Sequence, residues 1–318
     1  MSVRLGPVEL ACPRDHSALA DDGAQLRCGE GHTFKVTSGI PILLLDEFGS
    51  THPVFKVSLE KEEAPLWEGP GVDPRVRENI GPTCGVMYRP AAKEGFSEYP
   101  IPTLRLPRGD GKTLLDIGCH WGRWSIAASR LGYEAVGVDP SLDGIAAARS
   151  VAKQLDSNAV FVVGESRHLP FADDAFDVVF SYGVFQHFAK PDVLASFDEI
   201  GRVLKPGGTC LVQLANAWGA RSLMNQALER RFKEQRNVFD IRYWSPGELR
   251  AELERRIGRT ELFVDGYITL NPQPTDLYLL PWRYRAIVHV SEALRKVADK
   301  VPPLLTLADS IYARSISA

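Results

Sequence analysis

The chain lacks the sequence features of a membrane-spanning, secreted or disulfide-stapled protein. No apolar run reaches the roughly 20 residues that a bilayer-spanning helix needs. The first residues lack the charged start, apolar core and small-residue cleavage site of a secretory signal. The five cysteines are odd in number and scattered, at Cys12, Cys28, Cys84, Cys119 and Cys210. We therefore expect reduced thiols and a cytoplasmic protein.

A strong excess of positive charge is also missing. The 37 basic and 40 acidic residues give a formal net charge of −3, so the chain has no global field that would attract a polyanion. Nucleic acid is therefore not favoured as a substrate, although residues 221–236 form a local basic stretch. The 318 residues, 44% of them hydrophobic, are enough for one large packed domain and a smaller one.

The chain is organised around residues 112–139, KTLLDIGCHWGRWSIAASRLGYEAVGVD. An apolar run at 113–115 leads into a turn that contains Gly118 and Gly122, and an amphipathic segment follows. After Gly132 a second apolar run ends on Asp139. This order predicts a strand, a glycine turn, a helix and a second strand that ends on an acid.

Such a unit is suited to an adenosine-type ligand across the carboxyl ends of two parallel strands. Glycines let the backbone approach a ligand closely, and the helix N-terminus offers unpaired N–H groups. An acid about 20 residues further on commonly accepts from ribose hydroxyls. A dinucleotide turn would read GxGxxG, whereas this one begins with Asp116, which repels phosphate and attracts an ammonium group.

The pattern DxGxxxG resembles motif I, DxGxGxG, of the class I S-adenosylmethionine-dependent methyltransferases, with His120 in place of the middle glycine. The resemblance implies an α/β, Rossmann-like, seven-stranded sheet and S-adenosylmethionine as cofactor. In that family Asp116 would bind the amino-acid end of the cofactor and Asp139 the ribose. The cofactor-binding residues implied are Asp116, Gly118, Cys119, His120, Gly122, Asp139, Pro140, Ser141, Glu165, Ser166, Ser181 and Tyr182.

Several downstream phrases follow in the order typical of the same family. Residues 160–163 form a third apolar run before Glu165, which falls where relatives have an acid near the adenine amino group. LPFADDAFDVVFSYGVFQHF predicts a fourth strand at 176–181, and KPGG at 205–208 leads into a fifth. His187 lies where the methyl-transfer pocket is expected; it is either a general base or a structural residue of the helix that follows.

The C-terminal third is expected to build the substrate wall. Residues 216–245 are a basic helical insertion, and Ser245 is the expected N-cap of a helix that ends at Gly258. We expect a strand at 261–270, a helical insertion within 275–307, and a last, antiparallel strand at 310–316. Candidate substrate-binding residues, here and upstream of Lys112, are Tyr88, Arg89, Tyr99, Arg221 and Tyr243.

The N-terminal residues 1–48 are expected to form a small β-rich ribbon domain, joined by a linker with lid helices at 49–110 to the catalytic domain at 111–318. CPRDH and CGEGH followed by a GIPxLL-like tail resemble a Trm112-like zinc ribbon and the leader of bacterial 23S ribosomal RNA guanine methyltransferases. The resemblance implies structural Zn²⁺. The ligands would be Cys12, His16 or alternatively Asp15, Cys28 and His32; in the other interpretation the ribbon has lost its metal.

The leading functional prediction is an enzyme that transfers a methyl group from S-adenosylmethionine to O, N or C of a small molecule, in secondary metabolism or the synthesis of an envelope precursor. The ribbon leader and the basic insertion keep a ribosomal or transfer RNA methyltransferase as an alternative. A further alternative is a non-catalytic partner protein in which His120 marks a degenerate loop. The sequence leaves the oligomeric state open.

Overall fold

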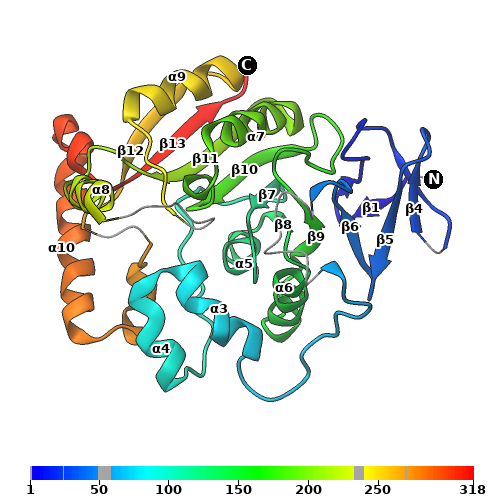
Figure 1. The fold of residues 1–318 in the computed structure, drawn as a ribbon, viewed down its shortest axis with the longest axis horizontal. Helices are drawn as coiled ribbons and strands as arrows, with labels where there is room; N and C mark the ends of the chain where they lie inside the picture. Colours follow the sequence, from blue (N-terminus) through cyan, green and yellow to red (C-terminus); the bar gives the residue numbers. More distant parts are fainter. Residues whose placement is uncertain (1, 24, 49–58, 233–239, 269–270) are drawn as a thin grey trace.

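The computed structural model describes residues 2–23, 25–48, 59–232, 240–268 and 271–318. Its described strands form one eleven-stranded mixed sheet and one two-stranded sheet. The strand order of the large sheet is β12-β13-β11-β10-β7-β8-β9-β6-β5-β4-β3, with helices on both faces (Figure 1). No helix among the described residues combines the length and apolarity that crossing a membrane requires.

The centre of the sheet is the parallel α/β unit that the motifs predict. Its elements are β7 (Thr113–Ile117), α5 (Arg123–Arg130), β8 (Glu134–Asp139), α6 (Leu142–Gln154), β9 (Val160–Gly164), β10 (Phe176–Tyr182), η2 (Phe185–His187), α7 (Lys190–Val203) and β11 (Leu204–Ala215). Successive residues of β7 point to opposite faces, so Leu114 packs in the core with α5 and α6, and Leu115 in the core with α7 and α9. Both faces of the strands are therefore buried, as parallel sheets require.

The C-terminal part adds two strands to this unit. Its elements are α8 (Ala220–Phe232), α9 (Pro246–Arg256), β12 (Thr260–Gly266), η3 (Pro274–Leu279), α10 (Trp282–Ala298), η4 (Pro302–Leu307) and β13 (Ser310–Ile316). The Ser245 hydroxyl caps α9 by accepting from the Glu248 N–H. β13 is antiparallel to both β11 and β12. The predicted cap, the helical insertion and the antiparallel last strand are confirmed.

The N-terminal residues form β1 (Arg4–Leu5), β2 (Val8–Glu9), β3 (Leu19–Asp21), β4 (Gln25–Cys28), β5 (Thr33–Thr37) and β6 (Ile40–Leu43). β6 pairs in parallel with β9, where Ile42 lies opposite Val163, so β3 to β6 extend the central sheet. Seven strands, β7 to β13, come from residues 111–318, and four strands of the N-terminal ribbon extend the expected seven-stranded sheet to eleven. The buried, apolar GIPxLL tail pairs with β9, which would otherwise be an edge strand, and the ribbon is therefore part of the same sheet.

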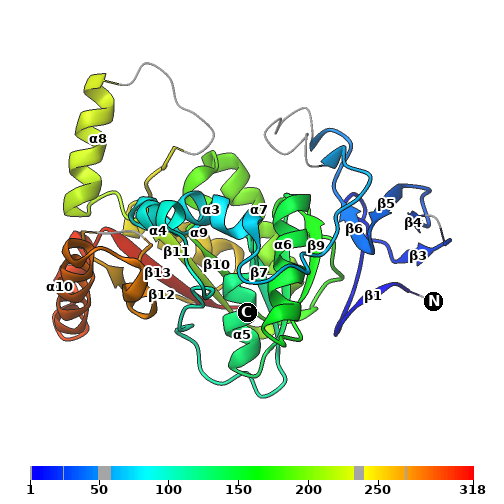
Figure 2. The ribbon, with the colours of Figure 1, turned by 90° about the horizontal axis from the view of Figure 1, so that it is seen from below.

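Two helices and a short turn cover the carboxyl edge of the sheet on the α6 side. They are α3 (Pro74–Cys84), η1 (Val86–Tyr88) and α4 (Arg89–Glu94), of which α3 lies beside α6 in Figure 2. Val76, Ile80 and Met87 share one buried cluster with Trp121 and Ile126 of the loop and helix that follow β7. The predicted lid segment therefore packs directly on the glycine loop; its residues 49–58 lie outside the described ones.

Candidate active site

Two buried carboxylates lie at the carboxyl ends of neighbouring parallel strands. Asp116 is the fourth residue of β7, and Asp139 is the last residue of β8. The register pairs Asp116 with Gly137, and Ile117 with Val138. The loop of residues 118–122 lies between the two strand ends. This is the arrangement that the sequence predicts for Asp116 and Asp139.

The loop depends on glycine at its two ends. Gly118 and Gly122 have φ of +75° and +79°, a region that other residues adopt at a cost. A Cβ on Gly118 would collide with Val184, and one on Gly122 would lie 2.9 Å from the Phe161 ring. The N–H groups of Gly118 and Cys119 both donate to the Val138 carbonyl, at 2.9 and 3.2 Å, which ties the loop to β8.

His120 keeps the backbone conformation for which a glycine would be suited. Its φ is +44°, and its N–H donates to Asp139 Oδ2 at 3.0 Å. The ring lies against Gly144 at the start of α6, and burial lowers the pKa of the imidazole. The ring atom Nδ1 is buried, and none of the described residues forms a hydrogen bond with it. An orphaned polar atom beside Asp139 fits a loop that receives a polar ligand.

Burial raises the pKa of both carboxyl groups. The pKa of Asp116 is raised to about 7, even though the Ser125 hydroxyl donates to it at 2.7 Å. Asp139 adds to that rise through like charge, and its own pKa is also raised by burial. Its Oδ1 accepts from the Ser141 N–H at 2.9 Å. A cationic ligand beside Asp116 would offset this cost, so the donor set fits an ammonium group.

The other predicted cofactor residues are distributed over two places. The Ser181 hydroxyl donates to the Ile117 carbonyl at 3.2 Å and so joins the end of β10 to the glycine loop. The carboxylate of Glu165 is paired with Arg167 at 2.7 Å. The Ser166 hydroxyl lies 2.8 Å from that of Ser196 in α7. Cys119 is buried and Pro140 half-buried within the loops that follow β7 and β8.

Tyr182 belongs to a polar cluster that the sequence did not predict. Its hydroxyl donates to Asp265 Oδ2 at 2.9 Å and accepts from Gln273 Nε2 at 2.7 Å. Arg105 pairs with Asp265 Oδ1 at 3.1 Å, and the Ser310 hydroxyl donates to Oδ2 at 2.7 Å. The Tyr182 ring also contacts Trp124 of α5, with centroids 4.6 Å apart. Tyr182 thus connects the end of β10 to β12 and β13.

A second network that the sequence did not predict joins the lid to α5, the helix that follows the glycine loop. Arg123, the residue after Gly122, donates to Asp276 Oδ2 at 2.8 Å and lies 2.8 Å from Cys84 Sγ. The Tyr88 hydroxyl donates to the same Asp276 oxygen at 2.5 Å. The sequence offered one signal, an acid within the otherwise apolar PTDLYLL, and its partners lie more than 150 positions away.

Residues that could bind the methyl acceptor surround Gly183, the residue after β10. A Cβ on Gly183 would lie 3.5 Å from Gln186 Nε2 and 3.6 Å from Asn271 Oδ1. Gln186 Oε1 and Asn271 Oδ1 are buried, and no residue in the described part of the chain forms a hydrogen bond with either atom. His187 ends η2, and Arg242 binds the carbonyls of Gln186 and His187 through its N–H and guanidinium groups.

The five predicted substrate residues do not converge on one place. Tyr88 is buried on Asp276, as described above. The Tyr99 hydroxyl donates to Gln154 of α6 at 2.5 Å, and Arg89 is exposed. Arg221 of α8 donates to the Ile268 carbonyl at 2.8 Å. Tyr243 is half-buried in the segment before α9.

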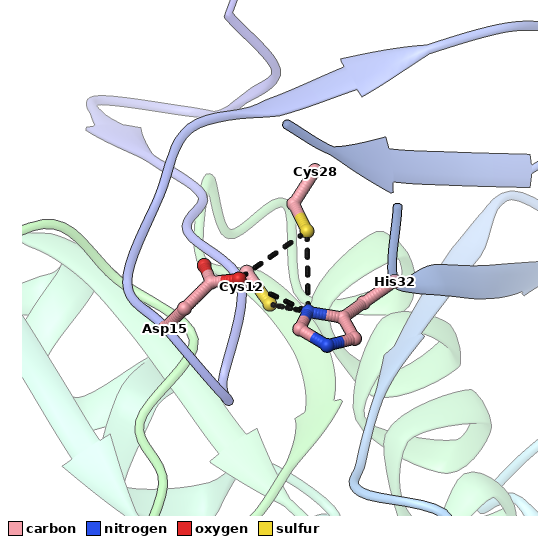
Figure 3. Close-up of side chains that lie close together, drawn as sticks. All are labelled: Cys12, Asp15, Cys28 and His32. Carbon is pink, nitrogen blue, oxygen red and sulfur yellow. Dashed lines mark hydrogen bonds and ion pairs between the residues drawn. The ribbon is translucent and has the colours of Figure 1, made fainter. Parts of the chain in front are cut away.

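The N-terminal residues form a second candidate site, shown in Figure 3. Ligand atoms of Cys12, Asp15, Cys28 and His32 all lie within 4.8 Å of one another. His32 Nδ1 is 3.5 Å from Cys12 Sγ, 3.3 Å from Cys28 Sγ and 3.0 Å from Asp15 Oδ2. Zn–S bonds of about 2.3 Å and Zn–N bonds of about 2.0 Å place S and N roughly 3.5 Å apart in a tetrahedron. The donor set therefore fits Zn²⁺ in chemistry and in spacing.

The fourth residue of this cluster is Asp15, and the assignment of His16 to the metal is corrected. His16 has φ of +59°, and its Nε2 lies 3.6 Å from Glu199 in α7, away from the cluster. The Asp15 carboxylate is held by Ser17, whose hydroxyl and N–H donate to Oδ1 at 2.5 and 2.9 Å. Those bonds lower the pKa of Asp15 and leave Oδ2 facing the cysteines.

Comparison with known proteins places the central residues among methyltransferases. Residues 114–208 match the sequence model of a family described as a methyltransferase domain. The chain is 34% identical over 137 residues to the ubiquinone biosynthesis O-methyltransferase of Azorhizobium caulinodans; the match covers 43% of this chain and 50% of that protein.

Two further similarities are of the same kind. The demethylmenaquinone methyltransferase of Staphylococcus saprophyticus is 36% identical over 102 residues, which are 31% of this chain and 42% of that protein. A solved structure of phosphoethanolamine N-methyltransferase 2 of Haemonchus contortus with S-adenosyl-L-methionine aligns at 16% identity and a TM-score of 0.48; it covers 76% of this chain and 59% of that one. The chain spans half or less of the length of the two sequence relatives.

Proposed function

We propose that this chain is an S-adenosylmethionine-dependent methyltransferase that acts on a small molecule. The observation that carries the proposal is the pair of buried carboxylates, Asp116 and Asp139, on either side of a glycine loop within residues that match a methyltransferase domain. The names of the two sequence relatives, which refer to ubiquinone and demethylmenaquinone, support a small-molecule acceptor.

Each carboxylate has one role in this proposal. Asp116 binds the ammonium group of the cofactor. Burial raises the pKa of this carboxyl group, and a positive charge beside it offsets the cost of ionising it. Asp139 accepts from the ribose hydroxyls, and the buried Nδ1 of His120 supplies one more polar contact. The bound cofactor supplies a methyl group on a positively charged sulfur, which is already activated for transfer.

The residues around Gly183 are proposed to hold the acceptor. Gln186 and Asn271 present amide groups whose oxygens lack partners, so they would bind a hydroxyl or amine that donates hydrogen bonds. We further propose that His187, in the same turn, removes the proton of that group. An O or N acceptor is therefore favoured over a C acceptor.

Calorimetry with S-adenosylhomocysteine tests the proposal. We expect one binding site in the wild-type chain, and loss of binding in Asp139→Ala. Asp177→Ala is the matched control, because that carboxylate lies at the opposite, amino end of β10. A wild type that binds no S-adenosylhomocysteine would favour the non-catalytic alternative. Once binding is established, a screen of products for a mass increase of one methylene identifies the acceptor. An affinity for RNA that falls steeply with salt concentration would instead support the RNA methyltransferase alternative.

We also propose that Cys12, Asp15, Cys28 and His32 bind a structural Zn²⁺. The support is the spacing of their ligand atoms and the orientation of Asp15 by Ser17. The ion would hold together the two turns that precede β3 and β5. Metal analysis of protein purified without added zinc is the test; a stoichiometry near zero with an intact fold would contradict the proposal.

A further inference from the structure

The outward face of α10 carries apolar side chains that nothing in the described structure covers. Its inward face buries Val288, Ser291 and Ala298. On the other side, Val290, Leu294, Val297 and Val301 are exposed, and Trp282 at the start of the helix is 81% exposed. The spacing 290, 294 and 297 places three of these residues along one stripe of α10, and Val301 follows three residues after the helix ends. The helix thus has a second apolar face, directed to the outside.

This exposure is concentrated at one end of the molecule. Of the fourteen large hydrophobic side chains recorded as exposed among the described residues, six lie between Trp282 and Leu307. Three more, Leu223, Met224 and Leu228, belong to α8. Figures 1 and 2 both place α8 and α10 at the end away from β1 to β5. Single exposed apolar residues need no explanation, but a contiguous group marks an interaction surface.

A basic stripe runs beside the apolar one. Arg285, His289, Lys296 and Lys300 are exposed; the first three lie on one side of α10, and Lys300 follows two residues after its end. The two acids of the same region are paired: Glu292 with Arg105 and Arg295 at 3.1 and 3.0 Å, and Asp299 with Arg295 at 3.5 Å. Within the described part of the chain, no carboxylate is recorded within 4.0 Å of Lys296 or Lys300.

We propose that the outward face of α10 docks on the surface of an anionic phospholipid bilayer, with the helix in the plane of the interface. An apolar stripe, a neighbouring basic stripe and a tryptophan at the border are what an interfacial helix requires. The apolar side chains enter the headgroup boundary, while the basic ones bind lipid phosphates. Because the net charge of the chain is −3, the attraction is local to this face.

A second copy of the chain fits this face less well. A symmetric contact buries the same patch on both partners. Two α10 helices in such a contact would bring their basic stripes close together, and like charges at that distance oppose association. A bilayer of anionic lipid instead offers charge of the opposite sign to every basic residue of the stripe.

Vesicle sedimentation tests the proposal on the full chain. We expect binding to vesicles of phosphatidylcholine mixed with phosphatidylglycerol, weaker binding to phosphatidylcholine alone, and weaker binding at high salt. Lys296→Gln/Lys300→Gln should lower the partition constant for the mixed vesicles by about 25-fold, at about a fivefold loss for each lysine. Arg27→Gln/Lys35→Gln, on β4 and β5 at the other end of the molecule, removes the same charge and should change nothing.

The apolar stripe needs its own variant. Val290→Glu/Val297→Glu should abolish binding to both kinds of vesicle while S-adenosylhomocysteine binding and circular dichroism stay unchanged; if this variant does not fold, Val290→Ser/Val297→Ser replaces it. Binding that survives in a folded variant would overturn the proposal, and so would no binding of the wild type at low salt. A wild type that ignores vesicles but is a dimer, and becomes a monomer in Val290→Glu/Val297→Glu, would assign the face to a second copy.

Discussion

Arg123 and Asp276 form an ion pair across 153 positions of sequence, with Nη2 and Oδ2 2.8 Å apart and side chains only 6% and 0% exposed. Arg123 begins the helix behind the glycine loop, and Asp276 lies in the segment between β12 and β13. Tyr88 of the lid donates to the same carboxylate. Three separate parts of the chain therefore meet at one buried charge pair beside the glycine loop.

Breaking this pair should cost far more stability than breaking an exposed one. Asp276→Asn leaves the Arg123 guanidinium buried without its counter-charge, so we expect a loss of about 3–5 kcal/mol in the free energy of unfolding. Urea unfolding measures it. The matched control is Glu261→Gln, which breaks the half-exposed pair with Arg314 and should cost much less, because water and salt screen an exposed pair. Equal losses in the two variants would contradict a structural role for the buried pair.

The raised pKa of Asp116 predicts that ionisation of this residue lowers the stability of the fold, although cofactor binding requires the ionised form. The unfolded carboxyl ionises near its ordinary pKa of 3.8, whereas the folded one ionises only at about 7. The folded state therefore holds the proton more tightly, and stability falls as pH rises from about 4 to 7. Asp116→Asn, which cannot ionise, should be more stable than the wild type at pH 8, by up to a few kcal/mol, and the difference should shrink toward pH 4.

The same substitution should remove cofactor binding, because a neutral amide offers no charge to the ammonium group. Thermal unfolding and calorimetry across this pH range measure the two effects separately. In the wild type, affinity for S-adenosylhomocysteine should fall as pH drops below 7, when Asp116 takes up a proton. A wild-type affinity that does not change between pH 6 and pH 8 would show that Asp116 does not bind the ammonium.

Local patterns predicted the parts of this molecule that local physics determines. The α/β unit from β7 to β11, the cap at Ser245 and the position of β13 follow from apolar periodicity, glycine turns and capping residues. The pairing of β6 with β9, and that of Arg123 with Asp276, did not follow. Each joins segments more than 100 positions apart. A carboxylate or an apolar strand has many possible partners in the sequence, and only the complete fold determines which of them lies close.

His120 gives a prediction about the loop itself. Because its φ is +44°, His120→Gly should relieve backbone strain and keep affinity for S-adenosylhomocysteine within about threefold, at the cost of one polar contact. His120→Val should destabilise the chain by about 1–3 kcal/mol, since a β-branched residue rarely adopts this conformation. Calorimetry and urea unfolding of the two variants provide the comparison. A valine variant as stable as the glycine one would show that the loop does not need this conformation.

His187 is tested by turnover once an acceptor is known. If its imidazole takes the proton, His187→Gln should lower kcat about 100-fold or more with little change in KM. His289→Gln, which changes an exposed imidazole of α10, is the control and should leave both constants unchanged. An unchanged kcat in His187→Gln at saturating acceptor would exclude a general base at this position.

The N-terminal cluster separates two neighbouring residues, Asp15 and His16. We expect Asp15→Ala to lose zinc, because only three ligands remain. Asp15 Oδ2 is the ligand atom that lies near the cysteine sulfurs. His16→Ala should keep zinc at one ion per chain, since its ring is directed to Glu199. Asp15→Cys should bind the ion more tightly, because a thiolate is the softer ligand. Metal analysis after dialysis against a chelator measures all three variants. Loss of zinc from His16→Ala together with retention in Asp15→Ala would reverse the assignment.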